Sequence, residues 1–170
     1  MRRPAILFLI VAAATATVFS QETKKAAPSD AQIAFAKLKA LAGSWQGSIM
    51  GIPISVTIRP TSSGTAILYE ADTEKGPPDH EITMFYVEDD RLIALHYCDA
   101  GNRARLEGKL SADGKALEFV FLDVNGSTKG GLVKRMSFSL TDPKKHIAEF
   151  TFIMPNGKPI ELRGEFTSLN

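Results

Sequence analysis

The stretch Leu41-Ala42-Gly43-Ser44-Trp45-Gln46-Gly47 decides the fold class of this chain. It stands where a short helical pattern ends and the first of about ten strand-like runs begins. A Gly-x-Trp-x-Gly at such a junction suits the closed end of a small antiparallel barrel, because glycines let backbones approach closely and the indole is a large apolar plate. We therefore predict a barrel whose floor is built by Trp45, Gly43 and Gly47 and whose other end is open.

One helix is predicted before this stretch. Ser29-Asp30-Ala31-Gln32 forms a capping box, in which Ser29 is the N-cap and Gln32 reaches back to its backbone. The apolar residues that follow share one helical face, up to about Ala42. We expect the helix to end at Gly43, as helices do at a C-terminal glycine.

Ten runs rich in β-branched and aromatic residues follow the helix. They are residues 45–50, 54–59, 65–71, 81–88, 91–98, 104–110, 116–124, 132–140, 146–154 and 160–168. Turn residues separate them, for example at Asp113-Gly114 and 155–157. Because short links force neighbouring strands to run antiparallel, we predict an all-β fold: an antiparallel up-and-down β-barrel of about ten strands with one short N-terminal helix at its closed end.

Hydrophobic patterning indicates how the strands are covered. Three runs, residues 83–87, 92–97 and 117–122, are apolar on both faces and need cover on both. The N-terminal helix or a second copy of the chain could supply it, so a homodimer is one expectation. In the last strand Glu161, Arg163 and Glu165 alternate with apolar residues, and we interpret them as a solvated charge ladder.

The N-terminus has the pattern of a secretory signal peptide. Arg2 and Arg3 precede an apolar run, and Val18-Phe19-Ser20 fits the small-residue cleavage rule. We predict a signal peptide at 1–20, a flexible leader at 21–28 and a single barrel domain at 29–170 in a secreted or periplasmic protein. The apolar run is short for a membrane span and no later run is longer, so no span is expected after cleavage.

Charge and cysteine content narrow the function classes. Removing Arg2 and Arg3 from the 20 basic residues leaves 18 against 19 acidic ones. This near-neutral balance argues against a nucleic-acid partner, which usually requires a basic face. Cys98 is the only cysteine, so stability must come from packing and strand pairing rather than from an intrachain disulfide.

The helix, the segment 41–47 and the ten-strand meander together resemble the calycin-like barrels of the lipocalin and nitrobindin type. They look most like a group of secreted bacterial lipocalin-like proteins of unknown function, in which segment 95–103, Leu-His-Tyr-Cys-Asp-Ala-Gly-Asn-Arg, also has a counterpart. The resemblance implies an interior cavity for a small hydrophobic or amphipathic ligand. It also implies that a haem-binding member would hold iron through a histidine close to the C-terminus. Residues 163–170 contain no histidine, so neither haem nor another cofactor is expected.

His96 is the leading candidate for a ligand-binding residue. His96 and Cys98 lie two apart on a strand and so face the same way, which makes them half a metal site or a thiolate–imidazole pair. A metal needs three or four ligands and the sequence offers no second His/Cys cluster, so no metal site is predicted. The alternative is that Cys98 is a small buried residue and His96 a hydrogen-bonded wall residue.

Three further ligand-binding candidates are Tyr69, Tyr86 and His80. The tyrosines lie on barrel strands, where a buried phenol needs a partner, and His80 lies at the start of a strand. His146 follows Lys144 and Lys145, and we interpret it as part of a solvated basic turn.

The glycine-rich segment 125–131 is interpreted as a flexible hairpin loop that could lie across the mouth of the barrel. It lacks the Walker spacing. A strand rather than a helix follows it, so no helix N-terminus would face a phosphate.

Three functions remain open at this point. The first is an exported barrel that binds a small apolar or amphipathic molecule. The second is an enzyme on the same barrel with a histidine acid/base, although no Gly-x-Ser-x-Gly is present and no catalytic residue is predicted. The third is a filled barrel with a structural or interaction role. A cavity of a few hundred Å³ with His96 in its wall would separate the first two from the third.

Overall fold

The computed structural model describes residues 27–73 and 80–169. The predicted signal peptide and most of the predicted leader lie outside the described residues. The strands are β1 (Gly43–Ile49), β2 (Ile52–Thr61), β3 (Ala66–Thr73), β4 (His80–Glu88), β5 (Arg91–Tyr97), β6 (Asn102–Leu110), β7 (Ala116–Gly126), β8 (Leu132–Ser139), β9 (Lys145–Ile153) and β10 (Pro159–Ser168). The helix α1 (Asp30–Lys39) precedes them, and a 3₁₀ turn, η1 (Ser62–Gly64), joins β2 to β3.

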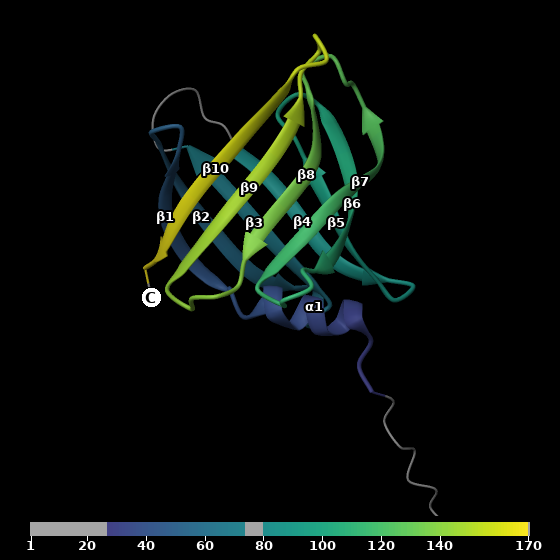
Figure 1. Ribbon diagram of the computed structural model, residues 1–170, viewed down its shortest axis with the longest axis vertical. Coiled ribbons are helices and arrows are strands. Elements are labelled where there is room, and N and C mark those ends of the chain that lie inside the picture. Colours follow the sequence, from purple (N-terminus) through teal and green to yellow (C-terminus); the bar gives the residue numbers. More distant parts are fainter. Residues whose placement is uncertain (1–26, 74–79, 170) are drawn as a thin grey trace, which may run out of the picture.

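The ten strands close into one antiparallel barrel (Figure 1). Each strand pairs with the next along the chain, and β10 returns to pair with β1, with Trp45 opposite Ser168 and Ile49 opposite Gly164. Closure gives every described strand a partner on both sides, although β7 pairs with β8 only over residues 116–120, and paired edges offer less of a template for aggregation. The prediction of a ten-stranded up-and-down barrel with one short helix is confirmed.

The helix α1 begins where the capping box predicts. The Ser29 N–H donates to Gln32 Oε1 at 3.0 Å, and the Gln32 N–H donates to Ser29 Oγ at 3.4 Å. The predicted end at Gly43 is wrong, because Ala40 is the C-cap. Residues 40–42 form a tighter turn with i→i+3 hydrogen bonds, and Gly43 opens β1 instead.

The helix lies across one end of the barrel (Figure 1). Its buried residues Ala31, Ala34 and Leu38 join the barrel core, and it contacts β2, β4, β5 and β6. No helix in the described ranges is both long enough and apolar enough to cross a membrane.

The floor of the barrel is built around Trp45. This side chain is 2% exposed, and its Nε1–H donates to the Leu41 carbonyl oxygen at 2.9 Å, which ties β1 to the turn after the helix. A Cβ on Gly47 would lie 2.1 Å from the backbone oxygen of Glu165, so only glycine lets β1 and β10 approach here.

Aromatic rings fill the half of the barrel next to the helix. The ring centroids of Phe85, Phe119 and Phe138 lie 5.3 to 6.0 Å apart in tilted and edge-to-face arrangements. Leu106, Leu117 and Met136 pack with them and are almost fully buried. This half is therefore a solid core rather than a container.

Of the strands that are apolar on both faces, some outward-pointing residues are buried and others are exposed. The helix covers the barrel end and not this face, yet Ile93, in the run 92–97, is completely buried within a single chain. Ile93 points outward because its neighbours Leu92 and Ala94 belong to the interior core. Val120, in contrast, is 55% exposed, so neither the helix nor the rest of this single chain covers the outer face there. The homodimer stays a prediction.

The charge ladder of the last strand lies on the outer face, as predicted. Arg163 Nη1 donates to Glu149 Oε1 on β9 at 2.6 Å, and Arg163 Nη2 donates to Glu165 Oε1 at 3.1 Å. All three side chains are about half exposed or more, so these ion pairs serve solubility and pairing register more than stability.

Candidate functional site

The barrel interior holds a cavity of about 210 Å³ in the half away from the helix. Its wall comes from six strands, β1 to β4, β9 and β10. Most of the lining is apolar: Ile49, Ile54, Phe150, Phe152, Leu162 and Phe166. The cavity is smaller than the roughly 300–1,000 Å³ of ordinary ligand pockets, so it suits a small molecule.

The rim of the cavity is apolar and accessible. Met50, in the turn between β1 and β2, also lines the cavity and is 78% exposed. Ile52 lies beside it on the rim and is also exposed. The open end of the barrel thus offers an apolar approach to the cavity.

Three polar side chains, Tyr69, Thr73 and Glu81, face the cavity. Tyr69 is almost fully buried and its ring lies 5.5 Å from that of Phe138, so it stands where the solid core meets the hollow. Burial, with the nearby charge of Glu81, raises the pKa of Tyr69 well above its usual range. The phenol therefore stays protonated and can donate a hydrogen bond to a bound molecule.

A polar cluster lies on the inner wall where β4 meets β5. It consists of Glu81 and Thr83 on β4, His96 on β5 and Cys98 just after it; Thr83 and His96 are directly opposite in the register. Thr83 Oγ1 and His96 Nδ1 are hydrogen bonded at 3.0 Å, and His96 Nε2 lies 3.7 Å from Glu81 Oε2. The ligand atoms of Glu81, His96 and Cys98 all lie within 4.8 Å of one another.

The imidazole of His96 is neutral at pH 7. The residue is 1% exposed, its ring meets Phe152 edge-on with centroids 6.2 Å apart, and burial lowers its pKa to about 4. A neutral ring offers one donor and one acceptor nitrogen. Because a general base works best with a pKa near the working pH, this environment disfavours histidine acid/base catalysis at neutral pH.

A tight turn fixes Cys98. Its N–H donates to the Asn102 carbonyl oxygen at 3.0 Å, and the Gly101 N–H donates to the Cys98 carbonyl oxygen at 3.0 Å. Burial, with a contribution from Glu81, raises the pKa of the Cys98 thiol to about 12. The thiol is therefore protonated and a poor nucleophile at neutral pH.

The loop that follows β7 packs against this same turn. Asn102 Nδ2 donates to the Gly131 carbonyl oxygen at 2.9 Å, and a Cβ on Gly130 would lie 2.7 Å from that of Ala100. None of the residues 125–131 lines the cavity, so this loop braces the β5–β6 turn rather than crossing the mouth.

The structure brings some of the sequence-predicted residues together and separates others. His96 lies on the inner wall and Tyr69 lines the cavity. Tyr86 does not contribute: because Phe85 beside it faces the core, Tyr86 lies on the outer face. His80 also lies outside, half exposed, with its Nδ1 against Asp72 Oδ1 and its Nε2 3.9 Å from Glu70 Oε1.

Sequence reasoning missed Glu81 and Thr83. The sequence could have indicated that both face inward, because they alternate along β4 with the inward-facing Phe85. That they lie beside His96, however, follows only from the register of the β4–β5 hairpin.

The interpretation of His146 as part of a solvated turn is wrong. This residue is 1% exposed, because it alternates inward after Lys145 and stands opposite Phe166 in the register. Its ring stacks on Phe166 with centroids 5.0 Å apart and meets Trp45 edge-on at 4.5 Å. Burial lowers its pKa to about 4, so His146 acts as a neutral aromatic spacer in the floor.

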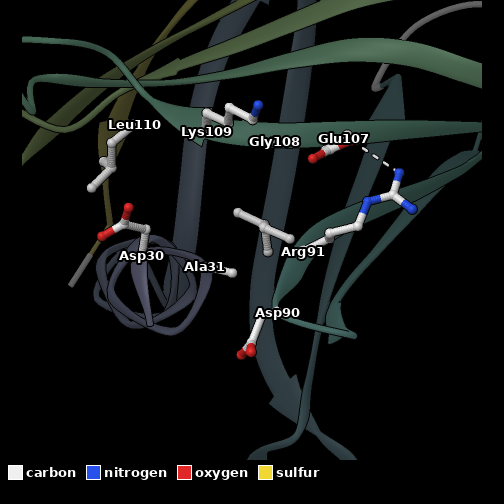
Figure 2. A pocket seen from close by; sticks show the side chains of 9 residues that line it. Asp30, Ala31, Asp90, Arg91, Glu107, Gly108, Lys109 and Leu110 are labelled. Carbon is white, nitrogen blue, oxygen red and sulfur yellow. Dashed lines mark hydrogen bonds and ion pairs between the residues drawn. The ribbon is translucent and has the colours of Figure 1, made fainter. Parts of the chain in front are cut away.

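A larger cleft, of about 540 Å³, lies on the surface beside the start of α1 (Figure 2). Charged side chains of both signs border it, among them Asp30, Asp90 and Lys109. Arg91 Nη2 donates to Glu107 Oε2 at 2.9 Å, the ion pair drawn in Figure 2. Because charged side chains dominate this surface cleft, whereas the interior cavity is mostly apolar with a few converging polar groups, the interior cavity is the better candidate site.

Comparison with known proteins supports the fold. No protein-family model matches the sequence, and no curated protein is similar to it. The crystal structure of Rv2717c from M. tuberculosis is similar with a TM-score of 0.62 and 16% identity, over 81% of this chain and 98% of that one. A protein of unknown function of the DUF3598 family from Nostoc punctiforme has a TM-score of 0.49 and 10% identity, over 77% of this chain and 48% of that one. The chain therefore resembles Rv2717c in its fold, a closed ten-stranded antiparallel barrel with one short N-terminal helix.

Proposed function

We propose that this chain is a binding protein that holds a small apolar or amphipathic molecule in the open half of its barrel. The cavity carries the proposal: apolar side chains form most of its wall, and a few polar groups converge on one side. That combination is what small-molecule sites generally share. The signal-peptide pattern of residues 1–20 supports a secreted or periplasmic location for this function.

The size of the cavity sets the expected affinity. A molecule that buries about 200 Å² of apolar surface gains at most about 5 kcal/mol at roughly 25 cal/mol per Å², so its dissociation constant should be about 0.2 mM or weaker once the cost of immobilising it is included. A hydrogen bond from Tyr69 would strengthen the binding of a molecule with one acceptor and would orient it. Indole and short-chain alcohols are therefore suitable probes at millimolar concentration.

A matched pair of variants on β1 tests this proposal. Ile49 lines the cavity, whereas its neighbour Ser48 is exposed on the outer face, so Ile49→Trp fills the cavity and Ser48→Trp adds the same ring outside it. Titration with indole, followed by amide chemical shifts, should saturate for the unmodified chain and for Ser48→Trp. Binding to Ile49→Trp should weaken at least about tenfold. Native mass spectrometry of the purified protein would identify a molecule that co-purifies.

The competing function is a filled barrel with an interaction role. It is favoured by the solid aromatic half and by the small volume of the hollow. If no small aromatic or aliphatic probe shifts the cavity resonances, or if Ile49→Trp binds indole as the unmodified chain does, the binding proposal fails and this alternative stands.

A further inference from the structure

The polar cluster around His96 contains a buried ring nitrogen that has no hydrogen-bond partner among the described residues, in a ring that lies beside a carboxylate and a thiol. Its hydrogen bond with Thr83 occupies Nδ1 and fixes the ring, while Nε2 is buried, without a hydrogen-bond partner among the described residues. The same Nε2 lies 3.7 Å from Glu81 Oε2, and a ring nitrogen of His96 lies within 4.8 Å of Cys98 Sγ. A buried nitrogen lone pair is costly unless something binds it.

We infer that Glu81, His96 and Cys98 together form a binding site for one zinc-type divalent cation. The donor set of one carboxylate oxygen, one imidazole nitrogen and one thiolate sulfur matches the ligands that Zn²⁺ takes in proteins. Metal–ligand bonds of about 2.0–2.3 Å at tetrahedral angles put neighbouring donors about 3.3–3.8 Å apart. His96 Nε2 and Glu81 Oε2, at 3.7 Å, already lie in this range, and since the three ligand atoms all lie within 4.8 Å of one another, side-chain movements of about 1 Å bring Cys98 Sγ into it.

The surroundings of the cluster are those of a preorganised metal site. A metal-bound histidine usually donates its other ring N–H to a partner that fixes its orientation. Here the partner is Thr83: with the proton on Nδ1, the ring donates to the Thr83 hydroxyl and turns its Nε2 lone pair toward Glu81 and Cys98. The braced β5–β6 turn fixes the backbone of Cys98 on the other side, and its thiol donates to Asp99 Oδ1 at 3.4 Å, a hydrogen bond that metal binding would replace.

Three protein ligands leave one coordination position open, as in catalytic rather than structural zinc sites. Because Glu81 also lines the cavity, a water molecule or a donor atom of a molecule in the cavity can complete the set. Binding replaces the S–H bond of Cys98 with a sulfur–metal bond and releases one proton to solvent for each ion bound. No electron is transferred in this step.

Cobalt(II) is the probe for this site, because its spectrum reports both thiolate ligation and tetrahedral geometry. Titration of the unmodified, metal-free chain should saturate at one ion with a sulfur-to-cobalt charge-transfer band and the release of one proton. The band should disappear on addition of excess Zn²⁺. The titration needs no occupant in the cavity, and Ile49→Trp on β1, which β2 and β3 separate from Glu81 on β4, should retain the site, so its outcome is separate from that of the indole experiment.

Four substitutions locate the ion. Cys98→Ser should abolish the charge-transfer band, and Glu81→Gln, which keeps the shape of the side chain, should weaken binding by more than the roughly 10–100-fold that loss of a positioning partner brings. Thr83→Val should weaken binding by about 10–100-fold and retain the band. The control is His80→Gln, since His80 lies beside the carboxylates of Glu70 and Asp72 on the outer face and should not affect binding.

Far-UV circular dichroism and thermal unfolding show whether each variant remains folded. The inference is overturned if the unmodified chain gives no saturable cobalt spectrum, or one without the sulfur band. It is also overturned if folded Cys98→Ser binds cobalt as tightly as the unmodified chain, or if His80→Gln loses binding, which would place the ion in the outer cluster.

Discussion

The barrel contains two buried histidines that differ in what surrounds them. His96 and His146 are each 1% exposed, and burial lowers the pKa of each to about 4. His146, in the floor, is enclosed by the rings of Trp45 and Phe166. His96, in the open half, has a hydroxyl on one nitrogen and a carboxylate and a thiol near the other.

The difference shows that buried side chains have different roles in the two halves of the barrel: packing in the floor, and polar contacts around a cavity in the open half. In the floor a histidine can pack as a flat ring, since shape and contact decide stability there. In the open half polar side chains converge on a hollow, an arrangement that packing alone does not require. The two halves share every strand, so the distinction arises from side chains and not from the backbone.

The largest difference between the two halves is expected in the loss of stability when one aromatic ring is removed from each half. Trp45→Ala deletes a buried plate and its hydrogen bond to Leu41, and should reduce the free energy of unfolding by about 3–5 kcal/mol. Phe152→Ala, at the half-buried cavity wall, should cost about 1–2 kcal/mol. Urea denaturation measures both, and equal losses would contradict a division into floor and container.

The next largest effect concerns pH and the floor histidine. The pKa of His146 falls from 6.5 in the unfolded chain to about 4 in the barrel, so the unfolded chain binds the proton first as the pH drops. The contribution of His146 to the free energy of unfolding is fully present above about pH 6.5, and about 3 kcal/mol of it is lost between pH 6.5 and pH 4. Because the rings of Trp45 and Phe166 face the imidazole, His146→Phe keeps its aromatic contacts and removes this loss.

Chemical denaturation at pH 8 and pH 4.5 tests that expectation. The His146→Phe variant should match the unmodified chain at pH 8 to within about 1 kcal/mol and exceed its stability at pH 4.5. A constant difference between the two chains at both pH values would show that His146 does not titrate as a buried ring.

A smaller effect on the free energy of unfolding is expected from the hydrogen bond of His96, a contact that His146 does not have among the described residues. Thr83→Val keeps the shape of the side chain but leaves His96 Nδ1 without its partner, and should cost about 1–2 kcal/mol in metal-free solution. In the His96→Phe background the same substitution should cost much less, because no ring nitrogen remains to be satisfied. Equal costs in both backgrounds would mean that the hydrogen bond does not contribute to stability.

The third histidine provides the exposed reference and the smallest effect. His80 is about half exposed and pairs with carboxylates on the outer face. His80→Gln should change the free energy of unfolding by less than about 1 kcal/mol. A larger loss would show that a surface ion pair in this barrel stabilises as much as the buried contacts of His96.

Much of the architecture could be predicted from local patterns. Every strand boundary falls within two residues of its expected position, because alternation and turn residues such as Asp113-Gly114 are local signals. The helix start at Ser29 was likewise predictable from its capping box. The helix end was not, since the Trp45 indole that holds the Leu41 carbonyl approaches from the next element.

The candidate site was predictable only in part. His96 stood out because histidine is rare here and lies two residues from the only cysteine. Glu81 and Thr83 lie 15 and 13 residues before His96, and only the hairpin register brings them to it. Tyr86 and Tyr69 looked alike as isolated phenols, and one now lies outside the barrel while the other lines its cavity.

The amino-acid sequence by itself determined the order of the elements, their antiparallel pairing and the presence of a glycine–tryptophan floor, because these depend on residues close together in the chain. Only the tertiary structure decided that His146 is buried between two rings, that a cavity of about 210 Å³ remains in one half of the barrel, and that a carboxylate, an imidazole and a thiol converge on one wall. Closure and strand register set those distances, and both depend on side chains that meet across the barrel from distant parts of the chain.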